Sequence, residues 1–233
     1  MLTSPPCYDY IFGAFKVTCV VTDARWQQNT YVVTHAASGK TLLIDPGGGA
    51  DFIIQYLENA CARLAHILLT HPHHDHIGAV AQLSEHFGVS CNFHKDDARL
   101  ISQAPMYALA LAKRSIAAVT RYETFDELVL EDEEFPLRSL HTPGHTKGSV
   151  CYHLDGFVFS GDTLFYQSIG RTDLPGSSLQ SLKSSVTSLL AKLSDNTVIF
   201  PGHGKPWVVK DALRWWSGLF NASPPQYDQF VGR

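Results

Sequence analysis

Histidine is concentrated in one short segment of the chain. Four of the twelve histidines in 233 residues lie between positions 71 and 76, where the sequence reads His71-Pro72-His73-His74-Asp75-His76. Histidine is the commonest metal ligand in proteins. His71 and His73 are two residues apart, so both side chains point the same way if the chain there is extended. Asp75 and His76 follow where the chain turns into a helix. These six residues can therefore contact two metal ions.

Later loops offer the further ligands that a site for two metal ions needs. His145, Asp162 and His203 each follow a predicted strand, and each lies next to a glycine. Glycine lets the backbone approach an ion closely. A lone histidine is more often structural than a ligand, but three such positions beside a histidine-rich loop favour a shared metal site.

The residues around these positions predict strands and helices in alternation. We expect strands at 15–21, 30–34, 41–44, 66–69, 89–93, 137–140, 150–153, 157–160 and 197–200, and helices at 51–59, 77–87, 177–193 and 210–219. Residues 96–121 are rich in Ala and Leu, which predicts a helical segment broken at Pro105. Strands interleaved with helices indicate a layered α/β protein with its helices outside.

Four short motifs, in this order, resemble the metallo-β-lactamase superfamily. They are His71-x-His73-x-Asp75-His76, Gly144-His145-Thr146, Gly161-Asp162 and Gly202-His203-Gly204. Within the superfamily, the segments 160–165 and 169–176 resemble the glyoxalase II-like (hydroxyacylglutathione hydrolase-like) hydrolases. These motifs together are far more specific than any one of them.

The resemblance implies a fold and a domain organisation. The fold is a four-layer αββα sandwich, in which two mixed β-sheets carry outer helices. We expect residues 1–233 to form a single domain of this fold, with a helical segment at 96–122 near the active site. Residues 206–233 are expected to form an aromatic C-terminal helix and tail.

The resemblance also assigns the metal ligands. One site would use His71, His73 and His145, and the other would use Asp75, His76 and His203. Asp162 would bridge the two ions. We expect two divalent metal ions per chain, with zinc as first choice and iron or manganese as alternatives, because mixed nitrogen and oxygen ligands do not select one metal cleanly.

This metal centre suggests a hydrolase that cleaves a thioester. Two dications lower the pKa of a bridging water, and the resulting hydroxide attacks the carbonyl carbon of the substrate. Asp75 is the predicted catalytic residue, because it can bind a metal and orient the hydroxide. The sequence has no Gly-x-Ser-x-Gly motif, which argues against a serine hydrolase.

The substrate is predicted less sharply than the reaction. The acyl group could be carried by glutathione, coenzyme A or a carrier protein. Arg171 is the predicted anchor for a substrate carboxylate, and Lys147 is a second candidate. Alternatively, Arg171 pairs with Asp173 and holds its own loop. Only 30 residues follow His203, too few for the helical C-terminal domain of larger glyoxalase II enzymes.

Two other functions are compatible with the same fold. One is a persulfide dioxygenase that uses one iron ion, held by a subset of the same ligands. The other is a non-enzymatic metal-binding or regulatory protein. A β-lactamase is less well supported, because many of those enzymes have cysteine where this chain has Asp162.

Composition argues against several partners. The net charge is 18 − 22 = −4 and the cations form no stripe, which argues against nucleic-acid binding. Apolar runs are far shorter than the roughly 20 residues of a membrane span. Five scattered cysteines and no secretory leader suggest reduced thiols in a cytoplasmic protein. We therefore expect a monomer or homodimer that binds a small-molecule or carrier-bound acyl thioester, but no nucleic acid and no membrane.

Overall fold

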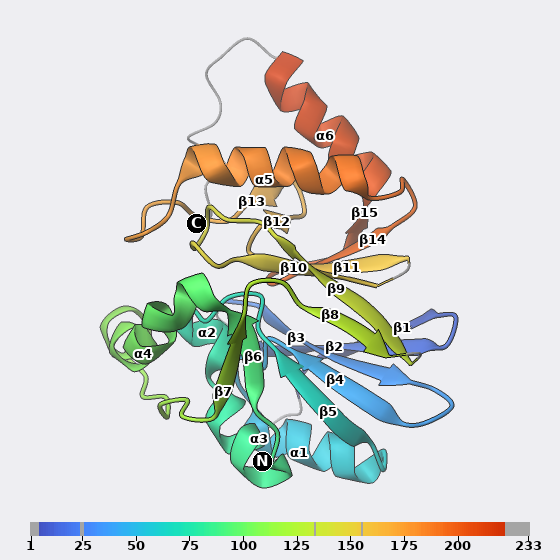
Figure 1. The fold of residues 1–233 in the computed structure, drawn as a ribbon, viewed down its shortest axis with the longest axis vertical. Helices are drawn as coiled ribbons and strands as arrows, with labels where there is room; N and C mark the ends of the chain where they lie inside the picture. Colours follow the sequence, from blue (N-terminus) through green and yellow to red (C-terminus); the bar gives the residue numbers. More distant parts are fainter. Residues whose placement is uncertain (1–4, 24–25, 133, 155, 222–233) are drawn as a thin grey trace. The chain divides into compact units, whose positions relative to one another are not determined.

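The computed structural model describes residues 5–23, 26–132, 134–154 and 156–221. The chain divides into two compact units, Met1–Asp126 and Glu127–Arg233. Each unit contains one large β-sheet and its own helices (Figure 1).

The first unit is built on a seven-stranded sheet whose strands follow chain order. The strands are β1 (Cys7–Phe12), β2 (Phe15–Asp23), β3 (Gln28–His35), β4 (Lys40–Ile44), β5 (Arg63–Leu68), β6 (Cys91–His94) and β7 (Tyr122–Phe125). Strands β1 to β4 pair antiparallel, whereas β4 to β7 pair parallel. The sheet is therefore mixed, and its parallel half needs crossover connections between the strands.

Helices provide those crossovers. They are α1 (Ala50–Asn59), α2 (His74–Ile77), α3 (Val80–Phe87), the short 3-10 helix η1 (Lys95–Asp97), α4 (Ala98–Tyr107) and the π-helix η2 (Ala108–Ala112). Helices α1 and α3 lie side by side on this sheet (Figure 1). Ile53 and Leu57 of α1 are one turn apart and fully buried, as are Val80 and Leu83 of α3. This helical spacing places apolar side chains in one core with the sheet.

The second unit is built on a six-stranded sheet in the order β15-β14-β11-β10-β9-β8. Its strands are β8 (Val129–Asp132), β9 (Phe135–His141), β10 (Val150–Leu154), β11 (Phe157–Gly161), β14 (Val198–Pro201) and β15 (Trp207–Val208), and a separate pair is formed by β12 (Leu164–Phe165) and β13 (Ser168–Ile169). Only the β11–β14 pairing of this sheet is parallel among the residues described.

Two helices pack in the core of the second unit. They are α5 (Leu179–Lys192) and α6 (Val209–Asn221), and they contact each other. Ser178 caps α5 by accepting a hydrogen bond from the backbone N–H of Ser181, as the serines there predict. Trp207 and Trp216 are buried in this core, which is the commoner role of aromatic residues at helical spacing.

Some elements differ from the sequence prediction. The helix expected at 77–87 is two helices, because α2 ends at Ile77 and α3 begins at Val80. The segment 96–122 is helical as far as Ala112, and its helix continues through Pro105 before widening into η2. Residues 113–121, all of them described, form no helix or strand. Of the expected C-terminal helix and tail, residues 222–233 lie outside the described residues.

None of the helices that the structure describes is long and apolar enough to cross a membrane. All five cysteines are free thiols, and Cys19, Cys91 and Cys151 are buried. Burial raises the pKa of Cys19 and Cys91 to about 12, so both stay protonated at neutral pH.

Candidate metal centre

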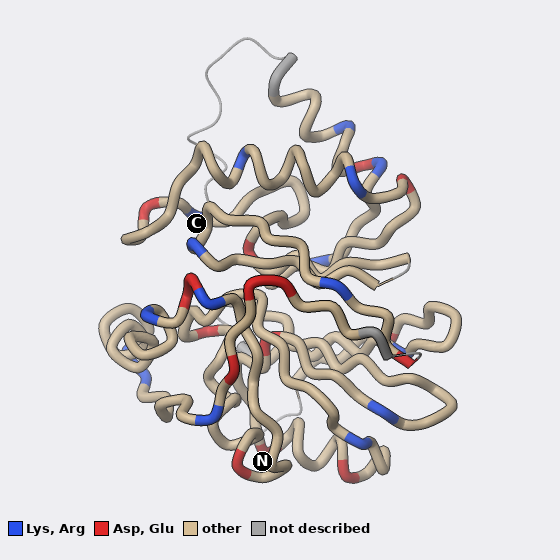
Figure 2. The backbone as a smooth tube through the Cα atoms, viewed as in Figure 1, with Lys and Arg blue, Asp and Glu red and all other residues tan. Residues whose placement is uncertain are grey.

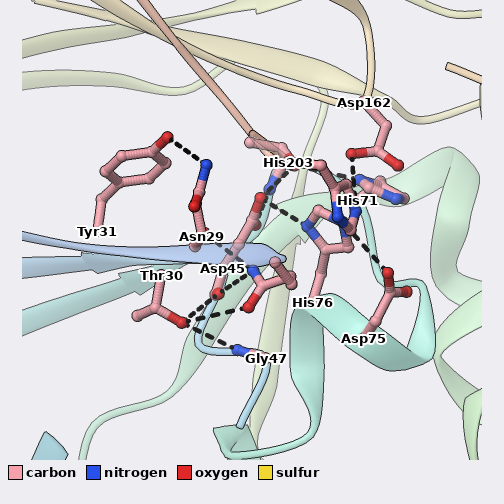
Figure 3. A network of polar contacts seen from close by, with 12 residues as sticks. Asn29, Thr30, Tyr31, Asp45, Gly47, His71, Asp75, His76, Asp162 and His203 are labelled. Carbon is pink, nitrogen blue, oxygen red and sulfur yellow. Dashed lines mark hydrogen bonds and ion pairs between the residues drawn. The ribbon is translucent and has the colours of Figure 1, made fainter. Parts of the chain in front are cut away.

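The histidine-rich loop of the first unit gathers its imidazoles at one point (Figure 3). His73 has extended backbone angles and directly precedes α2, as the spacing predicts. The ring centroid of His71 lies 4.7 Å from that of His73 and 4.1 Å from that of His76. Both His71 and His76 are buried. Three imidazoles in so small a space form the kind of cluster that binds a transition metal.

Sheet register explains why these residues meet. Strands β4 and β5 run parallel, and Ile44 of β4 pairs with Leu68 of β5. Both strands therefore end at the same edge of the sheet. Asp45 follows β4 directly, and Thr70 and His71 follow β5 by two and three residues.

Asp45 is a site residue that the sequence analysis missed. Its buried carboxylate accepts hydrogen bonds from the Thr70 backbone N–H at 2.7 Å and the Thr70 hydroxyl at 2.5 Å. It also accepts one from Nδ1 of His76 at 3.0 Å. Its backbone φ is 49°, in the left-handed region that aspartate tolerates better than most residues. An aspartate at a strand end before Pro46 was the available signal.

These hydrogen bonds orient the metal-binding nitrogens. The Thr70 hydroxyl donates to Asp45, so it accepts from Nδ1 of His71, which lies 3.1 Å away. Nδ1 of His76 donates to Asp45 directly. In both rings the proton is therefore held on Nδ1, and Nε2 keeps the lone pair that binds a metal. The donor set fits a metal ion.

Asp45 itself also lies within 4.8 Å of His71 and His76, measured between possible ligand atoms. Its carboxylate, however, is engaged by three hydrogen-bond donors. We therefore assign Asp45 to positioning the histidines, the usual role of a carboxylate behind a metal-binding imidazole.

Asp75 faces the metal-binding nitrogen of His76. Its Oδ2 lies 3.9 Å from Nε2 of His76, too far for a hydrogen bond. Metal–ligand bonds of about 2.1 Å allow two ligand atoms on one ion to lie up to about 4.2 Å apart. This separation suits a pair of ligands to the same cation.

The second unit has a cluster of its own, centred on Asp162. Strands β11 and β14 are parallel and Gly161 pairs with Pro201, so Asp162 and His203 leave the same edge of their sheet. Oδ1 of Asp162 lies 3.6 Å from Nε2 of His203, and Oδ2 lies 3.4 Å from Nε2 of His145. Each carboxylate oxygen thus faces a different imidazole, the arrangement expected of a carboxylate that bridges two ions.

The backbone orients His145. Nδ1 of His145 donates to the carbonyl oxygen of Arg171 at 2.8 Å, which leaves Nε2 for a metal. His203 is held differently, since the ring of Phe165 packs edge-on against it with 5.7 Å between centroids.

Two glycines let the ligand loops pack tightly. A Cβ atom on Gly47 would lie 1.8 Å from the carbonyl oxygen of Asp75. A Cβ atom on Gly170 would lie 2.0 Å from the carbonyl oxygen of Asp162. No larger residue fits at either position without a backbone shift, so each glycine fixes the distance between its loop and a predicted ligand.

The two predicted substrate contacts are both exposed. The guanidinium of Arg171 binds Asp173 through two hydrogen bonds of 2.7 Å, and these bonds lower the pKa of Asp173 to about 2. Arg171 thus makes the loop contact that the sequence left as an alternative. Lys147 lies beside Gly176 of the same loop. Their roles toward substrate remain predictions.

Comparisons with known proteins agree with this fold and these ligand clusters. The model of the metallo-beta-lactamase superfamily matches residues 23–203. Hydroxyacylglutathione hydrolase GloC from Haemophilus influenzae is 35% identical over 190 residues, which cover 79% of this chain and 89% of that relative.

Two solved structures have the same fold. BLEG-1, a B3 metallo-beta-lactamase, has a TM-score of 0.78 and 31% identity, covering 84% of this chain and 95% of its own. The protein TTHA1623, in a di-iron-bound form, has a TM-score of 0.76 and 34% identity, covering 83% and 96%. The predicted fold class, with two mixed sheets and flanking helices, is confirmed. Its relatives and its clusters of His and Asp side chains identify this chain as a metallo-hydrolase, and it belongs to the metallo-β-lactamase superfamily.

Proposed function

We propose that this protein hydrolyses acyl thioesters with two bound divalent cations. The observation that carries the proposal is Asp162, whose two carboxylate oxygens face Nε2 of His145 and Nε2 of His203. A carboxylate shared in this way is the ligand that a binuclear centre needs. The similarity to a hydroxyacylglutathione hydrolase supports a thioester as the substrate.

The proposed ligand set draws on both clusters. It comprises His71, His73 and His145 for one cation, Asp75, His76 and His203 for the other, and Asp162 for both. When bound, the cations supply a water of lowered pKa and a Lewis acid for the carbonyl oxygen. Zinc and iron both suit these donors, and a structural relative binds two iron ions.

The side chains of the protein contribute orientation and proton handling. Asp45 and the carbonyl of Arg171 keep the protons of His76 and His145 on Nδ1. Asp75 is proposed to orient the attacking water and to accept its proton. The oxygen of the water adds to the carbonyl carbon and the C–S bond breaks, which gives a carboxylic acid and a thiolate. The acid then loses the second proton of the water to solvent and becomes a carboxylate. A thiol has a pKa near 8.5, so its thiolate leaves without a proton donor.

The test is turnover of a thioester panel with metal content measured on the same sample. S-lactoylglutathione, acetyl-coenzyme A, decanoyl-coenzyme A and acetyl-pantetheine would be offered to zinc-, iron- and manganese-loaded protein, with chelated protein as control. We expect two ions per chain and hydrolysis that stops on chelation. Two bound ions with no thioester turnover would refute the proposal. One iron per chain with oxygen consumption on a persulfide would favour the dioxygenase instead.

Substitution of Arg171 tests how the substrate is held. If Arg171 anchors a substrate carboxylate, Arg171→Ala should raise KM for S-lactoylglutathione by about 10- to 100-fold, since a hydrogen bond to a charged group contributes about 1.5–3 kcal/mol. The value of kcat should change far less. Steady-state kinetics at a fixed metal load provide the measurement.

Asp173→Asn is the matched control for this substitution. It breaks the same ion pair but keeps the Arg171 guanidinium available to the substrate. An anchoring Arg171 therefore predicts a KM that does not rise in Asp173→Asn. Equal effects of the two substitutions would mean that the ion pair only supports the loop.

A further inference from the structure

Helix α4 and the π-helix η2 carry an exposed apolar surface. Met106, Leu109 and Leu111 are 57%, 60% and 46% exposed, although they lie within six residues of one another. On the inner side of the same segment, Ile101 and Ala104 are buried in the core of the first unit. The segment is thus packed on one side and presents large aliphatic side chains to solvent on another. We call Met106, Leu109 and Leu111 the 106–111 surface.

This surface is attached to the loop that carries the predicted metal ligands. Nη2 of Arg114 donates to the carbonyl oxygen of His74 at 3.1 Å and lies 3.5 Å from the carbonyl oxygen of Gly47. Helix α4 also contacts α2, the helix that contains Asp75 and His76. The apolar side chains and the metal ligands of the first unit therefore belong to one connected structure. A π-helix is rare and often marks a functional position.

The segment is also strongly basic in an acidic protein. Residues 98–122 contain Arg99, Lys113, Arg114 and Arg121 but no Asp or Glu, whereas the whole chain has a net charge of −4 (Figure 2). Arg99 and Lys113 are exposed and lie on the two sides of residues 106–111 along the chain, whereas Arg121 lies beside Gly88, at the end of α3. An apolar surface with cations at its two ends is complementary to a molecule that has both an alkyl chain and anionic groups.

We propose that the 106–111 surface binds the acyl chain of a coenzyme A thioester, while the flanking cations attract the phosphates of the carrier. This inference rests on the proposed thioesterase function and narrows its substrate to acyl-coenzyme A of medium or long chain. Glutathione thioesters have neither a long alkyl chain nor phosphate, so they use neither feature.

Chain-length dependence of binding tests the apolar contact without requiring turnover. Nonhydrolysable S-ethyl-, S-hexyl- and S-decyl-coenzyme A would be titrated calorimetrically into the metal-loaded protein. Each methylene that is fully buried should tighten Kd by about fourfold, which corresponds to about 0.8 kcal/mol. We expect at least a tenfold gain from ethyl to decyl. The double variant Met106→Gln/Leu109→Gln should reduce that gain to threefold or less.

Ile11→Gln is the matched control. Ile11 is an aliphatic side chain that is 69% exposed, and it lies on β1, the edge strand farthest from β7 in the strand order of the same sheet. The Ile11→Gln substitution should leave the gain in affinity from ethyl to decyl unchanged. Circular dichroism and metal content of all three proteins would show that the double variant is folded and loaded.

The cations have a separate test. Decyl-coenzyme A should bind more weakly as salt rises, and Lys113→Gln should reduce this salt dependence. S-decyl-pantetheine, which has no phosphate, should show little salt dependence in either protein. Equal salt dependence for both ligands would overturn the phosphate part of the inference.

Other occupants of the surface would give different results. Equal Kd values for ethyl and decyl ligands would overturn the inference even if acetyl thioesters are hydrolysed. If Kd does not depend on alkyl chain length, and the wild-type protein binds phosphatidylglycerol vesicles but the double variant does not, the surface binds a membrane. A dimer that the double variant converts to a monomer in sedimentation would assign it to a second copy. Failure of all thioester turnover would refute the proposed function separately.

Discussion

Asp162→Asn should reduce kcat/KM for thioester hydrolysis by more than about 100-fold and lower the metal content below two ions per chain. The amide keeps the shape of the carboxylate but offers only one oxygen, so it faces one of the two imidazoles with a nitrogen that has no lone pair for a metal. Residues that merely support metal ligands already contribute about 10- to 100-fold in affinity or activity. A bridging ligand should contribute more. Metal analysis and steady-state kinetics on one preparation measure both effects.

Asp173→Asn is the appropriate comparison for this variant. Asp173 lies eleven residues further along the chain, is exposed and pairs with Arg171 instead of facing two histidines. It should keep its full metal content. If Asp162→Asn retained two ions and normal hydrolysis, the bridging role and the proposed centre would both be wrong.

Asp45→Asn should lower the free energy of unfolding of the metal-free protein by about 2–4 kcal/mol. The substitution keeps the side-chain volume, and asparagine tolerates the φ of 49°, so the backbone is not the cause. The amide oxygen can still accept from the Thr70 N–H, but its NH₂ group then meets the Thr70 hydroxyl or Nδ1 of His76 as a second donor. Losing buried hydrogen bonds to a charged group contributes about 1.5–3 kcal/mol each. Urea denaturation measures the change.

The same variant should weaken metal binding by about 10- to 100-fold, because His76 loses the acceptor that holds its proton on Nδ1. Asp51→Asn provides the control, since Asp51 is exposed and its carboxylate accepts a hydrogen bond from the Gln82 amide at 2.6 Å. Its stability should change by less than about 0.5 kcal/mol. If Asp45→Asn had the same urea midpoint of unfolding as the wild-type protein, the stabilising role proposed for the hydrogen bonds of Asp45 would be wrong.

The ligand loops could be predicted from the sequence because few residue types bind metals, and these can be recognised directly. His71, His73 and Asp75 stand out by composition and spacing alone. Asp45 did not, because its importance depends on the alignment of β4 with β5, which brings Thr70 and His76 to it. A strand end followed by proline and glycines looks the same whether its aspartate serves a turn or a metal site.

Several of the elements that the sequence did not predict share a physical reason. Strand β1 has three exposed residues in succession, Cys7 to Asp9, so it lacks the apolar alternation that predicts a strand. Strands β12 and β13 have two residues each, too few to show any period. Helix α2 is a single turn of four residues, too short to show the helical period. In each of these elements the local pattern is too short or too irregular to predict the structure, which packing against the rest of the protein decides.

Gly47 and Gly170 set a limit on engineering this centre. Each abuts the carbonyl oxygen of a predicted ligand at a distance that leaves no room for a methyl group. In a random library screened for a new metal preference, variants with a substitution at either glycine should have disrupted ligand loops, whatever other substitutions they carry. A campaign to retune the metal preference should hold both positions constant and diversify exposed positions such as Lys147, which is not a predicted metal ligand.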